Sequence, residues 1–283
     1  MTIKNALTVD VEDYFHVSAF SSAIDQSEWD DHDLRVEGNT GLLLDMFDSK
    51  DIKATFFVLG WVAERRPEIV RAIHERGHEV ACHGFSHQLV YDQSPEVFRE
   101  ETLRSKHLLE DIISDRVSGY RAASYSITGR SLWALDILVE AGFEYDSSIF
   151  PVRHDRYGIP DAEELPHVLT TPQGANLVEF PLSTAHVLGY RLPVAGGGYF
   201  RLYPYWLTRA GLRQINRRQQ PFIFYLHPWE VDPQQPRVEA SLLSRFRHYN
   251  NLDRCEARLS RLIDDFSFTS VRDVLTERGL LAA

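Results

Sequence analysis

The sequence predicts an α/β fold in which parallel strands form a sheet and amphipathic helices cover it. Short apolar segments alternate along the chain with longer segments of helical periodicity, and this strand–helix repeat is typical of parallel sheets. The chain has 283 residues, of which 43% are hydrophobic, and this is ample for a full core. Because no repeat, low-complexity tract or linker interrupts the chain, we expect a single domain over residues 1–283.

The predicted strands are short and mostly apolar. They cover residues 6–11, 54–59, 79–82, 118–121, 143–147, 177–180 and 222–226. Helices are predicted near residues 40–49, 61–76, 95–114, 129–141, 204–218 and 239–265. Ser94 and Pro95 supply a helix cap and a first-turn proline, and Gly77 and Gly142 stand where a helix ends in a left-handed residue. In such folds, ligand sites form at the carboxyl ends of the strands.

The segment of residues 150–205 departs from this alternation. It is rich in proline, glycine and tyrosine and includes the run Gly196-Gly197-Gly198-Tyr199. We interpret it as an elaborated loop region over the site, which serves either as a substrate platform or as a structural insertion without ligand contact.

The composition excludes several classes of partner. A net charge of −11 argues against nucleic acid or an anionic membrane as the main partner, but is compatible with a sugar polymer. The sequence contains no run of 18 apolar residues, so no membrane-spanning helix is predicted. The first ten residues lack the pattern of a secretory leader, so we expect a cytoplasmic protein, and Cys82 and Cys255 are expected to be reduced thiols.

Two histidines, His83 and His87, give the strongest chemical signal. They follow the predicted strand 79–82 and are four residues apart. Neutral imidazole is the commonest metal ligand, and two imidazoles with one carboxylate leave positions on a divalent ion open for water and substrate. Zn²⁺, Co²⁺ and Ni²⁺ all accept such ligands. On spacing alone, the pair could also be two polar residues at a strand end.

Three carboxylates, Asp10, Glu12 and Asp13, close the first predicted strand. Alternate residues of a strand face the same way, so Asp10 and Glu12 are expected to share a face. One carboxylate would bind the ion, and another would stay unbound and act as a base toward water. A solvated acidic loop is the alternative, but the apolar residues that lead into the cluster favour a buried strand end.

Arg121 ends the predicted strand 118–121. A guanidinium can hold a carboxylate through two parallel hydrogen bonds, so Arg121 is expected to fix the base. An arginine in this position is otherwise most often part of a surface ion pair.

His227 ends the strongly apolar strand 222–226. Such a strand is buried, so its terminal imidazole is expected to face a cleft, where it can donate a proton to a leaving group. The carboxylate that orients it is one of Asp146, Glu179 and Glu230.

Together these runs resemble the polysaccharide deacetylases of carbohydrate esterase family 4, which share the NodB homology domain. Among them, the chain is most similar to the subgroup associated with exosortase and PEP-CTERM loci. The resemblance covers nearly the whole chain and implies a distorted, incomplete (β/α)7-type barrel. It rests on His83-Gly84-Phe85-Ser86-His87, Tyr120-Arg121-Ala122-Ala123-Ser124-Tyr125, Leu226-His227-Pro228, Tyr125-Ser126-Ile127, Tyr145-Asp146-Ser147-Ser148-Ile149-Phe150-Pro151 and Phe268-Thr269-Ser270-Val271.

The resemblance also implies roles for individual residues. One divalent ion, most readily Zn²⁺, would be held by His83, His87 and an acidic residue of the first strand. Asp10 would be the catalytic base, Arg121 its partner and His227 the catalytic acid.

Two departures from the family pattern leave assignments open. The family usually has two adjacent aspartates, whereas this chain has Asp10-Val11-Glu12-Asp13, so either Glu12 or Asp13 would be the acidic ligand. The proline that usually follows the arginine is replaced by Ala122, so the backbone N–H of the oxyanion pocket is assigned to Tyr125 or Ser124. We also expect Trp229 to contact substrate.

The expected function is metal-dependent N-deacetylation of an N-acetylated amino sugar in an exopolysaccharide or its lipid-linked precursor, with the inner membrane face as the expected place of action. An allantoinase-like hydrolase of cyclic amides is the first alternative, and a deep closed pocket would favour it. A groove lined by Tyr125, Tyr157 and Trp229 would favour sugar instead. A non-catalytic carbohydrate-binding protein is the second alternative, suggested by the altered acidic motif. The oligomeric state stays open.

Overall fold

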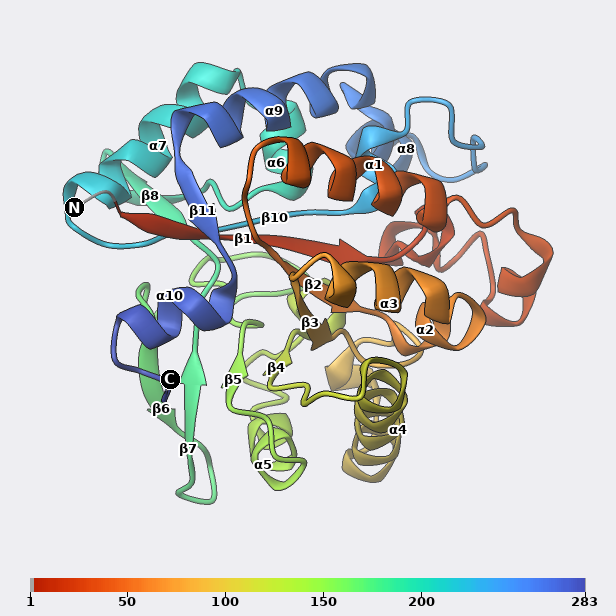
Figure 1. The fold of residues 1–283 in the computed structure, drawn as a ribbon, viewed down its shortest axis with the longest axis horizontal. Coiled ribbons are helices and arrows are strands. Elements are labelled where there is room, and N and C mark those ends of the chain that lie inside the picture. The colour runs from red at the N-terminus through yellow and green to blue at the C-terminus, as the bar shows by residue number, and fades with distance from the viewer. Residues whose placement is uncertain (1–2, 283) are drawn as a thin grey trace.

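The computed structural model describes residues 3–282 and shows one large, mostly parallel sheet flanked by helices (Figure 1). Within the described residues, the strand order is β10-β1-β2-β3-β4-β5-β7-β6, with β11 also paired to β1. Among the strand pairs of residues 3–282 in this sheet, β6–β7 is the antiparallel one. The strands are β1 Lys4–Val11, β2 Thr55–Val58, β3 Glu79–Cys82, β4 Gly119–Tyr120, β5 Tyr145–Asp146, β6 His167–Thr170, β7 Asn176–Glu179, β10 Ile223–Leu226 and β11 Ser267–Thr269.

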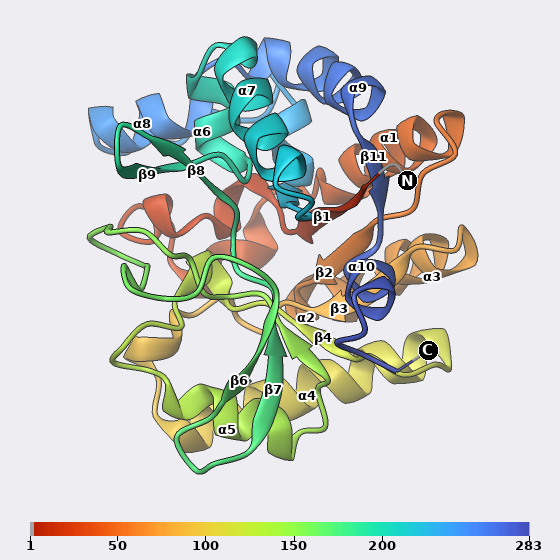
Figure 2. The same cartoon turned by 90° about the vertical axis from the view of Figure 1, so that its left-hand side faces the viewer.

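The helices cover the outside of this sheet. In Figures 1 and 2, α7 and α9 lie above β1 and β10, and α4 and α5 lie below. The helices are α1 Val36–Ser49, α2 Gly60–Arg65, α3 Pro67–Glu75, α4 Pro95–Ile113, α5 Trp133–Glu140, α6 Gly197–Leu202, α7 Tyr205–Arg217, α8 Leu242–Tyr249, α9 Cys255–Asp265 and α10 Val271–Glu277. Among residues 3–282, no helix has the length and apolar character needed to cross a membrane.

The first strand is the organising element of the sheet. One edge of β1 pairs with β10 in the register Ala6↔Ile223, and the other pairs with β11 near its start and with β2 near its end. Every residue of β1 after Lys4 is buried, which explains why most of them are apolar. Because these strands are parallel, their carboxyl ends emerge on one side of the molecule, where the candidate site residues follow them.

The predicted fold class is confirmed: the chain is an α/β protein with a mostly parallel sheet, and the sheet does not need to close into a complete barrel. The short strands β4 and β5 continue the curve that begins at β10, and the antiparallel pair of β7 and β6 ends it. The view in Figure 2 shows this curved sheet with β6 and β7 at its end.

Two predicted helices are each interrupted. The helix expected over residues 61–76 breaks at Arg66 because Pro67 disfavours helical backbone in the residue before it, and Arg66 has φ −136° and ψ 61°. The helix expected over residues 239–265 divides into α8 and α9, and Asn251 between them has a left-handed φ of 52°. The sequence periodicity continued across both breaks and did not reveal them.

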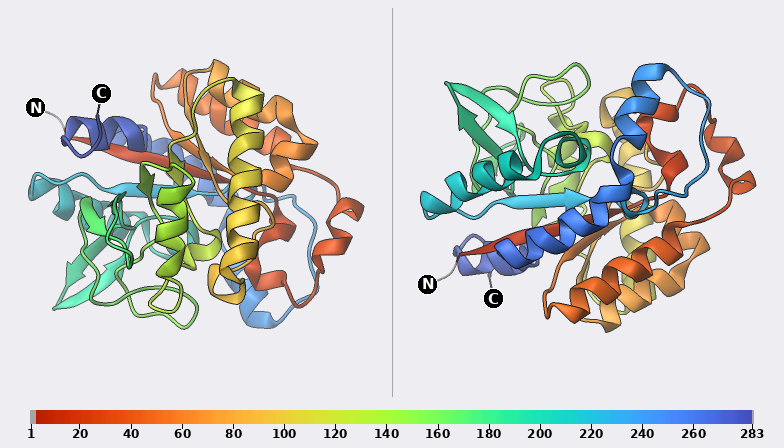
Figure 3. Two further views of the ribbon diagram at one scale, coloured as in Figure 1. Left: turned by 90° about the horizontal axis from the view of Figure 1, so that it is seen from below. Right: turned by 90° about the horizontal axis from the view of Figure 1, so that it is seen from above.

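The segment of residues 150–205 is more regular than expected. It contains β6, β7, the separate antiparallel hairpin of β8 (Thr184–Val187) and β9 (Tyr190–Pro193), and α6. Gly196 forms an isolated bridge with Tyr225, so the end of this segment is held directly against β10. Figure 3 shows the hairpin projecting beside α7.

Candidate metal and acid–base site

The carboxyl end of β1 places Asp10 against Arg121. The Nη1 atom of Arg121 donates to Oδ1 of Asp10 at 2.7 Å, and the hydroxyl of Tyr125 donates to Oδ2 at 3.3 Å. Both Asp10 and Arg121 are buried. The ion pair is therefore shielded from solvent and has a fixed direction.

Three further contacts hold the Arg121 guanidinium. Nη1 also donates to Oγ1 of Thr8 at 2.7 Å, Nη2 donates to Oγ of Ser147 at 2.9 Å, and Nε donates to the carbonyl of Ser147 at 3.1 Å. Its carbon lies 4.0 Å from the centre of the Phe57 ring. The guanidinium therefore connects the loop after β5 to β1, and Asp10 receives a donor whose position the core determines.

Glu12, His83 and His87 form a cluster in which one ligand atom from each residue lies within 4.8 Å of the others. The Nδ1 atom of His83 lies 2.8 Å from the carbonyl oxygen of Arg121. Since a carbonyl accepts, Nδ1 carries the proton and the Nε2 lone pair of His83 is free to bind a metal. Burial lowers the pKa of His83 to about 4, which favours the neutral imidazole that a metal needs.

The donor set of this cluster fits a divalent cation. Oε2 of Glu12 is buried without a hydrogen-bond partner, although Nε2 of His87 lies only 2.7 Å away. An orphaned buried carboxylate oxygen beside two imidazoles is the arrangement expected when all three point toward a shared ion. Burial raises the pKa of Glu12, but the neighbouring His87 and His227 outweigh burial and leave the pKa below its usual value. Two nitrogen ligands and one oxygen ligand suit Zn²⁺, Co²⁺ or Ni²⁺.

Asp13, the other candidate ligand, lies elsewhere. Its Oδ1 accepts from the N–H of Tyr14 at 2.9 Å, and its Oδ2 accepts from the N–H groups of Arg35 and Val36 at 2.6 and 2.8 Å. Asp13 therefore caps a short 3-10 turn and ties it to the start of α1. The carboxylate that faces the two histidines belongs to Glu12, because Asp13 already satisfies three backbone donors.

His227 lies between the two carboxylates that follow β1. Its Nε2 is 3.3 Å from Oε1 of Glu12 and 3.9 Å from Oδ2 of Asp10. Its Nδ1 is 3.1 Å from Oε1 of Glu230. Burial lowers the pKa of His227, but Glu12, Glu230 and Asp10 together raise it to about 9. The imidazole therefore holds a proton at neutral pH, as a catalytic acid must.

Of the three carboxylates considered as partners of His227, the structure brings only Glu230 to it. A 3-10 turn over Pro228–Val231 folds the chain back so that Glu230, three residues on, reaches the imidazole. Asp146 instead accepts from the hydroxyl of Ser148 at 2.5 Å, and Glu179 accepts from the N–H of Ile149 at 3.0 Å. These two acids support the loop after β5, and burial raises the pKa of Asp146 to about 6.

Arg201 lies next to Glu230, and no role was predicted for it from the sequence. It is 2% exposed, and its Nε lies 3.7 Å from Oε1 of Glu230. Its Nη atoms donate to the carbonyls of Arg247, His248 and Asn250 at 2.6–3.1 Å. The guanidinium therefore supplies the positive charge that a buried carboxylate requires and joins α6 to the end of α8. No local pattern in the sequence marks this arginine.

Trp229 lies beside His227 and is buried. Its ring stacks on His227 on one side at 5.0 Å and on His248 on the other at 4.2 Å. Its indole N–H points to Oε1 of Glu12 at 3.4 Å. The ring packs against His227 because the 3-10 turn directs it inward, and contact of Trp229 with substrate stays a prediction.

The two residues assigned to the oxyanion pocket both have left-handed backbone. Ser124 has φ 50° and Tyr125 has φ 56°. The N–H of Tyr125 donates to the carbonyl of Ala122 at 3.0 Å, and the hydroxyl of Ser124 pairs with that of Ser18 at 2.7 Å. Two successive strained residues beside Asp10 indicate a loop held in a special shape by its surroundings.

Further aromatic side chains lie beside Tyr125. Tyr157 lies 6.1 Å from the Tyr125 ring and stacks on His154 at 3.8 Å, and its hydroxyl is 3.2 Å from that of Tyr199. Tyr157 and Tyr199 both come from the segment of residues 150–205. This segment therefore contributes rings next to the site, as a substrate platform would.

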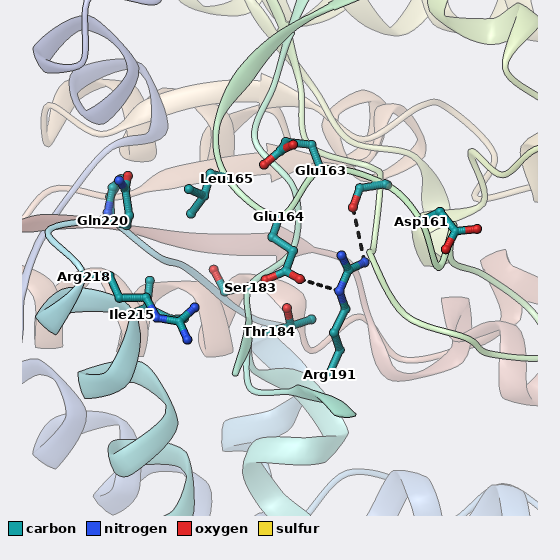
Figure 4. Close-up of a pocket in the computed structure, with 12 residues that line it drawn as sticks. Asp161, Glu163, Glu164, Leu165, Ser183, Thr184, Arg191, Ile215, Arg218 and Gln220 are labelled. Atoms are coloured by element: carbon teal, nitrogen blue, oxygen red, sulfur yellow. Dashed lines mark hydrogen bonds and ion pairs between the residues drawn. The ribbon is translucent and has the colours of Figure 1, made fainter. Parts of the chain in front are cut away.

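A separate cavity of about 250 Å³ lies near the amino end of β10 (Figure 4). It is lined by Ser183, whose hydroxyl accepts from the N–H of Ile223, and by the Glu164–Arg191 ion pair. Since the candidate site follows the carboxyl end of the same strand, this cavity is not part of it.

Fold and site together define an α/β protein with a candidate divalent-metal centre between an acid and a base. Residues 27–145 match the family model of polysaccharide deacetylase, and residues 147–276 match a domain of unknown function, DUF3473. These matches, with the relatives below, support a polysaccharide deacetylase domain in this chain. His83, His87 and Arg121 fall in the first match and His227 in the second.

The curated relatives match parts of the chain only. A peptidoglycan deacetylase of Helicobacter pylori is 29% identical over 114 residues, which are 40% of this chain and 38% of that protein. A peptidoglycan-N-acetylglucosamine deacetylase of Bacillus cereus is 32% identical over 81 residues, which are 29% of this chain and 28% of that protein. The chain thus spans less than half the length of these relatives.

Solved structures match almost the whole chain at low identity. A candidate polysaccharide deacetylase from Mycobacterium smegmatis has a TM-score of 0.62 and 18% identity, covering 97% of this chain and 90% of its own. The Puue allantoinase has a TM-score of 0.58 and 19% identity, covering 99% and 91%. Both similarities concern the fold alone. They do not distinguish a polysaccharide substrate from a cyclic amide.

Proposed function

We propose that this protein is a metal-dependent hydrolase that removes N-acetyl groups from an amino sugar in an exopolysaccharide or its lipid-linked precursor. The observation that carries the proposal is the juxtaposition of the Glu12–His83–His87 cluster with Asp10 on one side and His227 on the other. The polysaccharide deacetylase match over residues 27–145 supports the choice of an N-acetylated glycan as substrate.

In this proposal, Glu12, His83 and His87 hold the ion. When bound, such an ion polarises the acetyl carbonyl and makes a neighbouring water more acidic. Asp10 takes the proton of the attacking water, since its carboxylate is buried and oriented by Arg121. His227 then donates a proton to the departing amine, and Glu230 keeps its imidazole in position.

The oxyanion that develops on the acetyl carbonyl needs a donor from the chain as well. The N–H of Tyr125 is already engaged by Ala122, so the N–H of Ser124 is our candidate. Tyr157 is stacked between His154 and Phe150, so the half-buried Tyr199 ring beside it is our candidate for stacking on a sugar.

The two matched segments form one functional unit in this proposal, because His83 and His87 come from the first and the acid His227 from the second, while Asp10 and Glu12 precede both. Membership of the exosortase-associated subgroup is also proposed, on the runs Tyr125-Ser126-Ile127 and Tyr145-Asp146-Ser147-Ser148-Ile149-Phe150-Pro151.

The test is acetate release from N-acetylated oligosaccharides, with and without a chelator, combined with metal analysis of the purified protein. His83→Ala should remove both metal uptake and acetate release, because it deletes one of the imidazoles. His107→Ala on the exposed face of α4 is the matched control and should change neither. Full acetate release by the His83 variant would refute the metal assignment.

An allantoinase-like activity is the second candidate, favoured by the fold likeness to the Puue allantoinase. Allantoin in the same assay distinguishes the two, since only one substrate class should be hydrolysed in a chelator-sensitive way. Metal uptake without hydrolysis of any substrate would favour a carbohydrate-binding protein instead.

A further inference from the structure

Helix α8 presents apolar side chains to solvent. Leu242 is 83% exposed, Leu243 57% and Phe246 56%. At 100° per residue these three positions fall within one arc of the helix, so they form a continuous apolar stripe on its outer face. Isolated exposed leucines are ordinary, but three large apolar side chains gathered on one short helix are the mark of an interaction surface.

Exposed arginines flank this stripe. Arg245 and Arg247 lie on either side of it along the helix, and Arg237 precedes the helix. Glu239 is the single acidic residue of the segment from residue 234 to residue 250. An apolar face bordered by cations is the pattern of helices that lie in the interface of an anionic membrane.

The net charge of the whole chain does not oppose this arrangement. At physiological ionic strength, charges more than about 8–10 Å apart are largely screened. The −11 of the chain is therefore felt only weakly at the arginines of α8.

The position of α8 connects it to the candidate site. His248, the one buried residue of α8, stacks on Trp229, which in turn stacks on His227. Figures 1 and 3 show α8 on the side toward which β1 and β10 run, with α10 on the opposite side. A membrane surface bound to α8 would therefore lie close to the candidate site.

A second copy of the chain fits this stripe less well than a lipid surface does. A stable protein interface buries roughly 800 Å² per partner, which three side chains on one short helix do not supply. Interfacial anchoring needs only a few apolar side chains that enter the headgroup region while cations contact the lipid phosphates.

We propose that α8 docks the protein on an anionic membrane surface through Leu242, Leu243 and Phe246, with Arg245 and Arg247 on the lipid headgroups. Docking is peripheral and reversible. It does not depend on the deacetylase proposal, and it concerns a surface outside the site residues.

The experiment is sedimentation of the full chain with vesicles of phosphatidylcholine, alone or mixed with phosphatidylglycerol. Binding is expected to the mixed vesicles, to weaken at high salt, and to fall about tenfold in a Leu242→Ser/Phe246→Ser variant. Arg245→Gln/Arg247→Gln should lose the preference for phosphatidylglycerol. The control is Val97→Ser/Val168→Ser, which removes exposed apolar side chains from α4 and β6 and should bind as the parent does.

Acetate release from a soluble oligosaccharide is measured in parallel and should be unchanged in all three variants, so docking and catalysis are scored separately. Absence of vesicle binding by the parent chain would overturn the proposal. So would equal binding by the parent and the Leu242/Phe246 variant, or a dimer in light scattering that this variant abolishes. If the Leu242/Phe246 variant fails to fold, the arginine variant and the salt dependence of the parent still decide the question.

Discussion

At the scale of single residues, the buried Asp10–Arg121 pair determines the geometry of the site. Arg121 donates to Asp10, Thr8 and the loop after β5 at once, which needs more hydrogen-bond donors in one plane than a lysine offers. The fixed fork of a guanidinium is what allows one side chain to make all these bonds.

Replacing Arg121 with methionine should lower the free energy of unfolding by about 3–5 kcal/mol, because Asp10 would be left buried without its partner. Urea unfolding measures this change. The control is Arg99→Met, which breaks an exposed pair with Glu140 and should cost less than about 1 kcal/mol. Equal losses in the two variants would contradict the assigned role of Arg121.

The carboxylate of Glu230 favours the protonated form of the His227 imidazole. Three carboxylates raise the pKa of His227 to about 9, and in the proposed mechanism His227 can donate its proton only below that pKa. Glu230→Gln removes one negative charge, lowers the pKa of His227 and should therefore move the basic limb of the kcat/KM profile to lower pH. Rates measured from pH 6 to about 10 test this; an unshifted basic limb would show that Glu230 does not act on His227.

At the scale of elements, close backbone contact between the segment of residues 150–205 and β10 places the aromatic rings beside the site. Gly196 has φ 133°, and a Cβ there would lie 1.9 Å from the carbonyl oxygen of Tyr225. The glycine run noted in the sequence therefore has a structural cause: a side chain at Gly196 would force this segment away from β10.

Gly196→Ala should lower the melting temperature by more than about 5 °C, since both the backbone angle and the space exclude a side chain. Gly129→Ala is the control, because a Cβ there meets nothing within 4 Å. Thermal unfolding followed by circular dichroism compares the two, and a Gly196 variant as stable as the control would show that the segment is not held this way.

At the scale of the whole molecule, β1 depends on strands from the far end of the chain. It pairs with β10 and β11, more than two hundred residues later, as well as with β2. A chain that stops at residue 205 would leave one edge of β1 and its apolar side chains uncovered.

Such a truncated chain should not fold, although it retains every residue of the polysaccharide deacetylase match. Far-ultraviolet circular dichroism and proteolysis would show this. Cooperative unfolding of residues 1–205 alone would mean that the two matched segments are independent domains and would contradict our proposal of one unit.

The sequence predicted seven strands of the sheet, their parallel direction and the polar residues that follow them, because a buried strand followed by a polar side chain is a local pattern. It did not predict β6 or the β8–β9 hairpin, which lie in the segment of residues 150–205. It could not choose between Glu12 and Asp13, since both follow β1 and only the backbone donors around Asp13 separate them. It left three carboxylates open for His227, because a 3-10 turn rather than a strand delivers Glu230.

The amino-acid sequence by itself was enough to predict the class of fold and the kinds of side chain that follow the strands, because periodicity and residue type are local properties of the sequence. Tertiary structure alone decided which oxygen faces which nitrogen, brought Arg201 behind Glu230 and turned Trp229 inward. These outcomes depend on contacts between residues far apart in the chain, and burial, which makes each contact matter, is a property of the folded molecule.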